Sequence, residues 1–317
     1  LLLKARKNEI FVYEMSSHQL FELKKSPAIA VFLNAFPAHL DYYKNFKEYF
    51  EAKENITLHQ NQNDIFIYNK DSRLLMRTAR NSKAKKISFS LKNRSADCYL
   101  QKGYIFYKKE KVFKISDSPL KGEFNFLNIM PGVIIGRILG VASVKITQAV
   151  KSFKNLPYRL EFVGKYSGID FYNDSLATIP EATIGAIEAL GRDVQTIILG
   201  GFESGLDYKG LAKTILKKEI KNLIFFPTTG KKISKEVKDY GRIYKNTGKN
   251  RGVARHFFVN NMKDAVALAF EYTKKGKVCL LSPAAPSFGI FRDYKERGDL
   301  FEKYVKAFAK RRPSKVS

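Results

Sequence analysis

The chain has few of the residues that build disulfide frameworks and metal cages. Its 317 residues include only two cysteines, Cys98 and Cys279, which stand far apart and without the spacing of a zinc site. This excludes a disulfide framework, and a reducing compartment such as the cytoplasm fits best. The four histidines are scattered along the chain, which argues against a histidine-rich metal cage.

Long apolar runs are also missing. The longest, VIIGRILGVASV over residues 133–144, is too short to span a membrane and is interrupted by Arg137, so we expect a packed helix there and no membrane span. The N-terminal stretch LLLKARKNEIFVYEM contains no long apolar region, which argues against a signal peptide. It also lacks an initiator methionine, and we therefore expect that residues upstream are missing from this sequence.

Acidic residues are scarce relative to basic ones. The chain has 57 Lys and Arg against 30 Asp and Glu, a formal charge of +27, which implies attraction to phosphates or to acidic substrates. A basic nucleic-acid-binding module is one interpretation, because KGYIFYKKEKVF partly mimics the aromatic RNA-binding strand of an RRM. However, Ile105 stands where that motif has Gly or Ala, and no companion aromatic strand is evident. We therefore expect no nucleic-acid partner.

The length of the chain suits two domains of ordinary size. Leu156-Pro157 marks the predicted boundary, which gives domains over residues 1–155 and 156–317. Beyond the boundary, short apolar runs alternate with amphipathic ones: TIILGG, LAKTILKKEI, NLIFF, MKDAVALAFEYTKKG and KVCLLS. This alternation predicts an α/β fold with helices on both faces of a parallel sheet, whose ligands bind at the carboxyl ends of the strands.

The first domain combines two patterns. Residues 9–13 and 28–33 are short apolar runs of the kind found in buried parallel strands. Residues 64–115 contain the short, aromatic, alternating runs DIFIYN, KISFSL, CYLQKGYIFY and KVFKI, which predict an antiparallel sheet. Helices are expected over residues 41–56, 125–140 and 143–153.

Polar residues follow the two predicted N-terminal strands. Glu14, in YEMSSHQL, is placed to hold a hard cation such as Mg²⁺, although the same Glu-Ser-Ser turn can equally cap a helix. His39, in VFLNAFPAHLDYY, can be a ligand or a general base, but a lone histidine beside Pro and Leu is more often structural. Lys53, in YFEAKENI, lies on an amphipathic helix, where lysines are nearly always solvated.

A polar turn also follows a predicted strand in the second domain. FYNDSLAT, over residues 171–178, precedes a helix that we expect to begin near Pro180. Asp174 and Ser175 are good N-cap residues for that helix. Short polar side chains at a strand end can also hold a ribose or phosphate, so capping and binding are both open and are compatible.

Motifs of a known family run along the whole chain in order: YEMSSHQL, NAFPAHLDYYKNFKEYFEAKENI, LKGEFNFLN, LPYRLEFVGKYSGIDFYNDSLATIPEAT, ILGG and LLSPAAPSFGIFRDYKERG. In order and spacing they resemble the Mur ligase family, closest to its MurD branch. The resemblance implies an α/β fold. It would comprise the distal part of a central P-loop-type ATPase domain, with a parallel sheet and a small antiparallel sheet, followed by a Rossmann-like C-terminal domain.

The resemblance also implies roles for individual residues. Glu14, His39 and a carbamylated Lys53 would serve Mg²⁺ between ATP and substrate. Carbamylation turns a repelling ammonium into an anionic oxygen ligand. Asn128 would contact adenine, Asp174 would meet the ATP ribose, and Arg159 would reach the transferring phosphate. The catalytic residues would be His39, Lys53 and Arg159. Residues expected to contact the other substrates are Ser16, Gln19, Thr178, Ser287, Phe288, Arg292 and Tyr294.

The implied reaction belongs to peptidoglycan precursor synthesis in the cytoplasm. ATP phosphorylates the carboxylate of UDP-N-acetylmuramoyl-L-alanine, and the amine of glutamate attacks the acyl phosphate to give an amide, ADP and phosphate. We expect the enzyme to be a monomer. Positioning, metal charge and Arg159 would lower the barrier, as in other phosphoryl transfers.

The sequence departs from this family in two ways. Nothing matches the Gly-rich phosphate loop that cradles ATP, so we expect the chain to be truncated and inactive alone. In addition, Leu176 and Ser204 stand where the branch has lysines, and Gly289 where an aspartate is common. L-glutamate or another acceptor amino acid is therefore an alternative to D-glutamate. A catalytically dead scaffold is a further alternative, against which the retained site residues argue.

Overall fold

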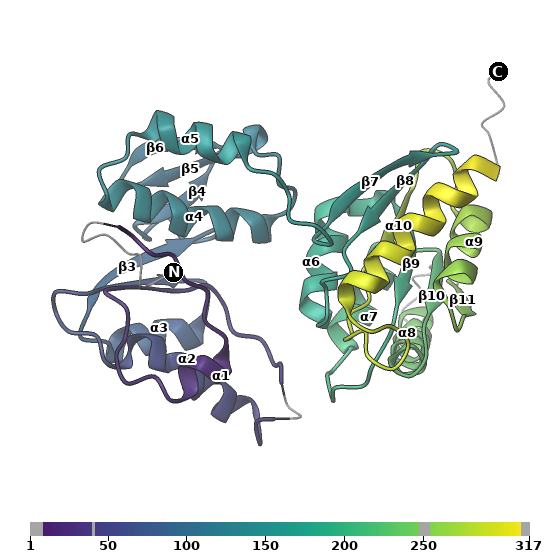
Figure 1. Cartoon of the computed structure of the whole chain (residues 1–317), viewed down its shortest axis with the longest axis horizontal. Coiled ribbons are helices and arrows are strands. Elements are labelled where there is room, and N and C mark those ends of the chain that lie inside the picture. Colours follow the sequence, from purple (N-terminus) through teal and green to yellow (C-terminus); the bar gives the residue numbers. More distant parts are fainter. Residues whose placement is uncertain (1–8, 40–41, 247–253, 312–317) are drawn as a thin grey trace.

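The chain forms two bodies, each built around its own six-stranded sheet (Figure 1). The computed structural model describes residues 9–39, 42–246 and 254–311. The first sheet ends before helices α4 (Glu123–Ile138) and α5 (Ser143–Ser152), and the second begins at strand β7 (Glu161–Tyr166). The predicted boundary at residues 155/156 falls in the connection between α5 and β7.

The first sheet is one continuous mixed sheet with its strands in chain order. Parallel pairing joins the first four strands, and the last three pair antiparallel. The strands are β1 (Ile29–Phe32), β2 (Ile65–Asn69), β3 (Lys85–Ser90), β4 (Cys98–Gln101), β5 (Tyr104–Tyr107) and β6 (Glu110–Lys114), followed by the short 3₁₀ helix η2 (Ile115–Asp117).

The prediction of an antiparallel sheet over residues 64–115 was wrong for β2 and β3. Helix α3 (Arg73–Asn81) lies between these strands and provides the crossover that parallel pairing requires. Its N-cap Ser72 accepts a hydrogen bond from the Leu75 amide at 3.4 Å. This helix was not predicted, because the whole segment was interpreted as alternating strands.

The segment before helix α1 (Ser17–Phe21) also differs from the prediction. Residues 9–13 were expected to form a buried strand, but they are irregular and exposed, with Val12 91% exposed. An apolar run becomes a strand only when its backbone finds a ladder partner. In the described part of the chain, no strand pairs with this segment.

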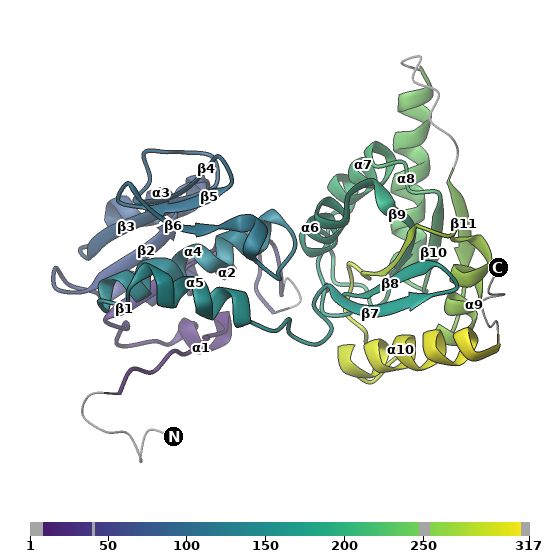
Figure 2. The same cartoon turned by 90° about the horizontal axis from the view of Figure 1, so that it is seen from above.

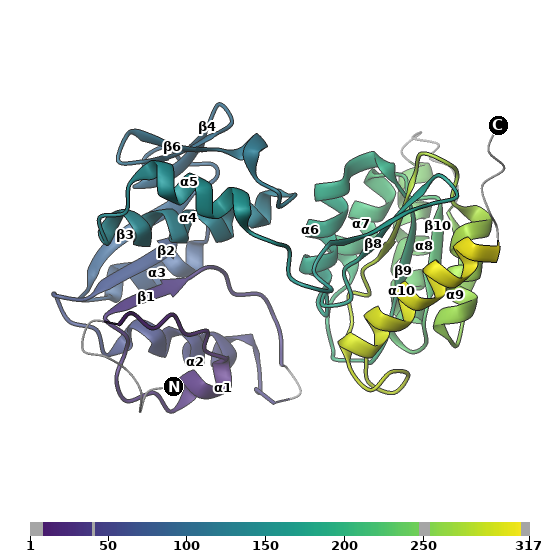
Figure 3. The ribbon, with the colours of Figure 1, turned by 45° about the horizontal axis from the view of Figure 1, so that its top comes forward.

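The helices of the first body cover its sheet. Helix α2 (Phe46–Leu58) begins at the N-cap Asn45, later than the residue 41 that we expected. Helices α4 and α5 confirm the helices predicted at 125–140 and 143–153 to within two residues. Figure 3 shows them lying along the antiparallel part of the sheet. Phe113, Met130 and Ile146 belong to the apolar core between them.

The second sheet has the order β11-β10-β9-β12-β8-β7 and is parallel except for β7. This confirms the predicted alternation of strands and helices. The other strands are β8 (Ile169–Asn173), β9 (Val194–Leu199), β10 (Asn222–Phe225), β11 (Arg255–Phe258) and β12 (Val278–Leu281). The helices are α6 (Pro180–Leu190), η3 (Gly191–Asp193), α7 (Lys209–Lys217), α8 (Thr229–Asn246), α9 (Met262–Tyr272) and α10 (Tyr294–Arg311).

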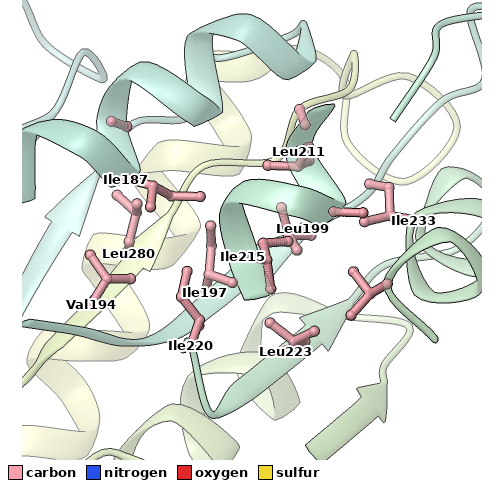
Figure 4. Packing of buried hydrophobic residues seen from close by; sticks show 14 of the residues in the cluster. Ile187, Val194, Ile197, Leu199, Leu211, Ile215, Ile220, Leu223, Ile233 and Leu280 are labelled. Carbon is pink, nitrogen blue, oxygen red and sulfur yellow. The ribbon is translucent and has the colours of Figure 1, made fainter. Parts of the chain in front are cut away.

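Two apolar cores flank the second sheet. One lies beneath α6, α7 and α8 and includes Ile187, Leu211 and Ile233 (Figure 4). The other lies beneath α9 and α10 and includes Val266 and Phe301. Figure 2 shows α10 along one face of the sheet and α6 and α7 on the opposite face. Burying each such side chain stabilises the fold by roughly 1.5–3 kcal/mol, so the strand ends between these cores are firmly held.

The two bodies touch between α4 and α6. The Lys121 ammonium donates a hydrogen bond to the Tyr172 hydroxyl at 2.9 Å, and Phe124 of α4 packs on the core beneath α6. These contacts bring the N-terminal end of α4 close to the carboxyl end of β8. Among the residues that the structure describes, no helix is long and apolar enough to cross a membrane.

Candidate active site

A cavity of about 440 Å³ lies between the two bodies. The first body contributes Asn34 and Ala38, from the loop that leads from β1 to His39, together with residues of α4. The second body contributes Arg159, Asp174 and neighbouring residues of the turn after β8. The cavity thus brings Arg159 and Asp174 of the second body together with the loop of the first body that leads to His39, a candidate metal ligand.

Asp174 is buried at the edge of this cavity. Its Oδ1 accepts a hydrogen bond from the Leu160 amide at 3.0 Å, and its Oδ2 accepts one from the Ser282 hydroxyl at 2.7 Å. Burial raises the pKa of Asp174 to about 7, against the opposing effect of these bonds and of Arg159 and Arg297. The carboxyl group therefore links the backbone at Leu160 to the side chain of Ser282.

The prediction that Asp174 and Ser175 cap helix α6 was wrong. The N-cap of α6 is Ile179, which makes no side-chain capping bond, and Pro180 takes the first helical position. Proline suits that position because its missing amide proton would have no partner there. The turn after β8 is consequently free to serve Leu160 and the cavity.

The structure brings His39 and Lys53 to the ring of Tyr49, and Glu14 lies near Lys53. The Lys53 ammonium lies 5.4 Å from the centre of this ring, and the His39 ring centre lies 6.2 Å from it. Burial lowers the pKa of Lys53, and the nearby Glu14 carboxylate opposes that shift. Glu14 and His39 are exposed, so the cluster faces solvent.

His18 is a member of this neighbourhood that the sequence analysis missed. Its ring lies edge-on to the His39 ring, with 5.1 Å between ring centres, and edge-on to the Tyr42 ring, with 4.5 Å between ring centres. No spacing rule marks a single histidine in a five-residue helix, so only the fold reveals the contact. Over the described ranges, His, Cys, Asp and Glu nowhere gather in groups of three that could hold a metal ion.

Ser16 and Gln19 form the capping box of helix α1. The backbone amide of Gln19 donates to Ser16 Oγ at 3.3 Å, and the backbone amide of Ser16 donates to Gln19 Oε1 at 2.9 Å. Gln19 also donates from Nε2 to the Tyr13 hydroxyl at 3.0 Å. These bonds show that the turn caps a helix. Both side chains are exposed, and their contact with a substrate stays a prediction.

Asn128 lies outside the cavity between the bodies. It is exposed on α4, one residue after Leu127, which does line that cavity. Asn128 instead lines a pocket of about 460 Å³ between α4 and α5, whose walls are apolar and include Val133 and Ile146. The predicted adenine contact therefore stands at the entrance to an apolar pocket next to the cavity.

The residues predicted to bind the amino acid lie at three places. Thr178 lines the cavity, beside Leu176. Ser287 is buried in the loop after β12, and the exposed ring of Phe288 lies edge-on to Phe202, 6.2 Å between centres. The structure therefore places only part of this predicted set beside Arg159 and Asp174.

Arg292 and Tyr294 lie at the start of α10. The Arg292 side chain is 81% exposed, with Nε 3.7 Å from Asp293 Oδ2. The Tyr294 carbonyl accepts a hydrogen bond from Ser175 Oγ at 2.7 Å, which ties the start of α10 to the turn after β8. Arg292 is thus free to meet solvent or a ligand, whereas the Tyr294 backbone has a structural bond.

The two lysine replacements have different surroundings. Leu176 adds an apolar wall to the cavity, whereas the Ser204 hydroxyl is buried and has no hydrogen-bond partner among the residues that the structure describes. Beside Ser204, the Lys232 ammonium pairs with the Glu203 carboxylate at 2.8 Å, so this loop gains little net positive charge. Gly289 has a φ of 85°, a backbone conformation that strains any residue with a Cβ, which explains glycine at that position.

Two family models match the chain. Residues 1–136 match the Mur ligase middle domain, and residues 158–285 match the model described as Mur ligase, glutamate ligase domain. The chain belongs to the Mur ligase family. The order of the two matches along the chain agrees with the order of the two sheets.

Curated relatives cover nearly the whole chain. A UDP-N-acetylmuramoylalanine--D-glutamate ligase of Bacillus mycoides is 36% identical over 299 residues, which are 94% of this chain and 63% of the relative. The ligase of the same name from Geobacillus kaustophilus is 34% identical over 300 residues, covering 94% and 64%. The chain therefore spans slightly less than two thirds of the length of these relatives.

Solved Mur ligases share the fold. MurF of Thermotoga maritima in complex with ADP matches with a TM-score of 0.61 and 18% identity, covering 90% of this chain and 64% of that one. MurC of the same organism matches with a TM-score of 0.64 and 14% identity, covering 93% and 62%. At such identities the likeness shows the fold alone, and it confirms the predicted α/β class.

Proposed function

We propose that this chain carries the metal-binding, phosphoryl-transfer and acceptor-binding parts of an ATP-dependent ligase. The ligase would join glutamate to UDP-N-acetylmuramoyl-L-alanine in peptidoglycan precursor synthesis in the cytoplasm. One observation carries the proposal: a single cavity combines Arg159 and Asp174 of the matched glutamate ligase domain with the His39 loop of the middle domain. The names of the curated relatives support the same reaction.

The reaction proceeds by two displacements. A carboxylate oxygen of UDP-N-acetylmuramoyl-L-alanine bonds to the γ-phosphorus of ATP as the bond to ADP breaks. The glutamate amine then attacks the acyl carbon, phosphate leaves, and the amine loses a proton to give the amide. Arg159 borders the cavity, and its guanidinium would neutralise charge on the transferring group, because a cation already in place needs no reorganisation.

Glu14, His39 and Lys53 fit a Mg²⁺ site with few protein ligands. Mg²⁺ commonly takes one or two carboxylates and completes its shell with water and phosphate oxygens, and it would there offset phosphate charge. Lys53 can join such a site only as a carbamate, which forms from the neutral amine. The burial that lowers the pKa of Lys53 favours the neutral amine.

Asp174 can hold its structural bonds and still meet the ATP ribose. Each carboxylate oxygen accepts about two hydrogen bonds, and Oδ1 and Oδ2 each receive one from the protein. Asn128 would offer its amide to the adenine edge from the neighbouring pocket. Ser16 and Gln19 would face the other substrate from the cap of α1.

The acceptor amino acid would lie among Thr178, Ser287, Phe288, Arg292 and Tyr294. Leu176 supplies no charge for a second carboxylate, and Lys232 is already paired with Glu203. Arg292, with its exposed guanidinium, is the cation that we assign to the glutamate side chain. A ligase for L-glutamate or for a neutral amino acid is the alternative that the missing lysines support.

An assay of amide formation tests the function. The 317-residue chain is measured alone, and again fused to the part of the Bacillus mycoides relative that it does not cover. We expect the fusion, as a monomer in sedimentation, to release phosphate with D-glutamate, UDP-N-acetylmuramoyl-L-alanine and MgATP, and the chain alone to be inactive. Arg159→Ala is the impaired control, with kcat lowered at least about tenfold. Preference for L-glutamate or a neutral amino acid would move the assignment to the alternative, and a folded fusion inactive with every acceptor would refute the proposal.

A further inference from the structure

Arg297 is a fully buried cation. Its Nε donates to the Ser175 hydroxyl at 3.0 Å, its Nη2 to the Ser175 carbonyl at 2.7 Å, and its Nη1 to the Ala285 carbonyl at 3.0 Å. Burial lowers the pKa of Arg297 to about 9, and the nearby Asp174 carboxylate opposes that shift. Burying a guanidinium costs free energy unless its donors are bonded. Arg297 directs its bonds to two loop residues, Ser175 and Ala285, which indicates a structural role.

The turn that Arg297 holds contacts both neighbours of Arg159. Next to Ser175, Asp174 accepts the hydrogen bond of the Leu160 amide at 3.0 Å. On its other side, the Leu176 amide donates to the Tyr158 carbonyl at 3.0 Å. The residues directly before and after Arg159 are thus fixed by the residues directly before and after Ser175.

The backbone around Arg159 is strained. Tyr158 has a φ of 61° and Leu160 a φ of 47°, in the left-handed region that bulky residues rarely adopt. Such strain persists only where surrounding contacts over-determine it, and it gathers at functional sites. Here the hydrogen bonds to the turn after β8 are among those contacts.

Helix α10 also holds the side chain of Tyr158. The Tyr158 hydroxyl donates to Asp299 Oδ1 at 2.7 Å. A Cβ at Gly298 would stand 2.4 Å from Tyr158 Cδ1, so only glycine lets the ring approach the helix this closely. Arg297, Gly298 and Asp299 are consecutive, and this one stretch of α10 therefore supports the strained segment both directly and through Ser175.

We propose that Arg297 is a positioning residue for Arg159. It locks the turn at residues 174–176, which holds residues 158–160 in the strained conformation that presents the Arg159 guanidinium to the cavity. This role rests on the proposed function, in which Arg159 meets the transferring phosphate. Because Arg297 is fully buried and bonded to Ser175 and Ala285, it does not bind the acceptor directly.

Hydrogen exchange tests the structural half of this proposal in the 317-residue chain without any ligand. Arg297→Met keeps the length of the side chain and removes its donors, and Arg192→Met makes the same change at an exposed arginine. We expect the Leu160 amide to exchange at least about tenfold faster in the first variant and unchanged in the second. If Arg297→Met does not fold, Ser175→Ala removes one acceptor and should show a smaller increase. Native protection of Leu160 in a folded variant would overturn the proposal.

A double-mutant cycle tests the catalytic half in the active fusion. Arg159→Ala and Arg297→Met should each lower kcat at least about tenfold with little change in the glutamate KM, and the double variant should be no slower than Arg159→Ala. Fully additive losses would show that Arg297 does not act through Arg159 and would overturn the role. If no fusion is active, the proposed function fails, and the exchange result alone decides whether Arg297 holds the strained segment.

Discussion

Two regions on either side of the cavity are built in opposite ways. The metal-side cluster consists of Glu14, His39 and Lys53, with two of its members exposed. The arginine-side turns, residues 158–160 and 174–176, are joined by backbone and side-chain hydrogen bonds and anchored by a buried arginine. One region keeps its charges open to ligands, whereas the other commits nearly all its polar groups within the protein.

The difference matches the demands of the proposed chemistry. A metal site with few protein ligands is completed by what it binds, so its side chains need access more than rigidity. A cation that stabilises a transferring phosphate must already stand in place, because reorganisation during the reaction would raise the barrier. The comparison therefore predicts loss of chemistry from changes on the metal side and loss of order from changes on the arginine side.

The largest effect is expected at Lys53. In the active fusion, Lys53→Ala should lower the rate of amide formation by more than about 10³-fold, about 4 kcal/mol, because the proposed anionic metal ligand would be lost. Short carboxylic acids should partly restore the rate by filling the vacated space. Lys53→Arg, which keeps the charge but forms no carbamate, should be equally inactive. Full activity of Lys53→Arg would make this residue an ordinary lysine.

The next effect is a pH dependence of stability at Asp174. Its pKa is raised to about 7 in the folded chain, so the folded state holds this proton more tightly than the unfolded state. The resulting stability amounts to roughly 4 kcal/mol; it is complete below about pH 4 and is lost as the pH rises through 7.

Asp174→Asn removes this titration while keeping the size of the side chain and an acceptor for Leu160. Denaturant unfolding at pH 4 to 7 measures the difference in unfolding free energy between the two proteins. We expect the native chain to lose stability relative to the variant across this range. A difference that does not change with pH would show that Asp174 titrates near its ordinary value, and that burial does not raise its pKa.

The smallest effect is expected at Arg292, outside both regions. Arg292→Ala in the active fusion should raise the glutamate KM about tenfold, about 1.4 kcal/mol, and leave ATP affinity unchanged. The exposed Lys295 provides a matched control, since Lys295→Ala removes a neighbouring charge of α10. Equal effects at both positions would point to general attraction by basic charge in place of a specific contact.

Much of the fold follows from local pattern, and the failures have identifiable causes. Alternating apolar and amphipathic runs sufficed for the inner strands β9, β10 and β12 of the second sheet because these strands are buried on both faces. Residues 9–13 have the same apolar character, but strand formation depends on a ladder partner that composition does not report. The parallel pairing of β2 and β3 was missed because α3 is short and highly charged.

Part of the candidate site could be predicted from the sequence, but for a different reason. Motif resemblance supplied Glu14, His39, Lys53, Arg159 and Asp174, and the fold brings them to two neighbouring places. Composition alone gave no reason to separate the buried Arg297 from the exposed Arg292, since both stand in one basic stretch. Which arginine enters the interior is decided by contacts with Ala285 and with Ser175, the latter 122 positions away.

The separate cores of the two bodies carry a consequence for heat denaturation. One pair of apolar clusters belongs to the first sheet and another pair to the second, while the bodies share few contacts. Without ligand, a calorimeter should record two melting transitions. A molecule seated in the cavity between them acts as a crosslink, because neither half can melt without releasing it. Merging of the two peaks as nucleotide is added would report occupancy of the cavity without any turnover.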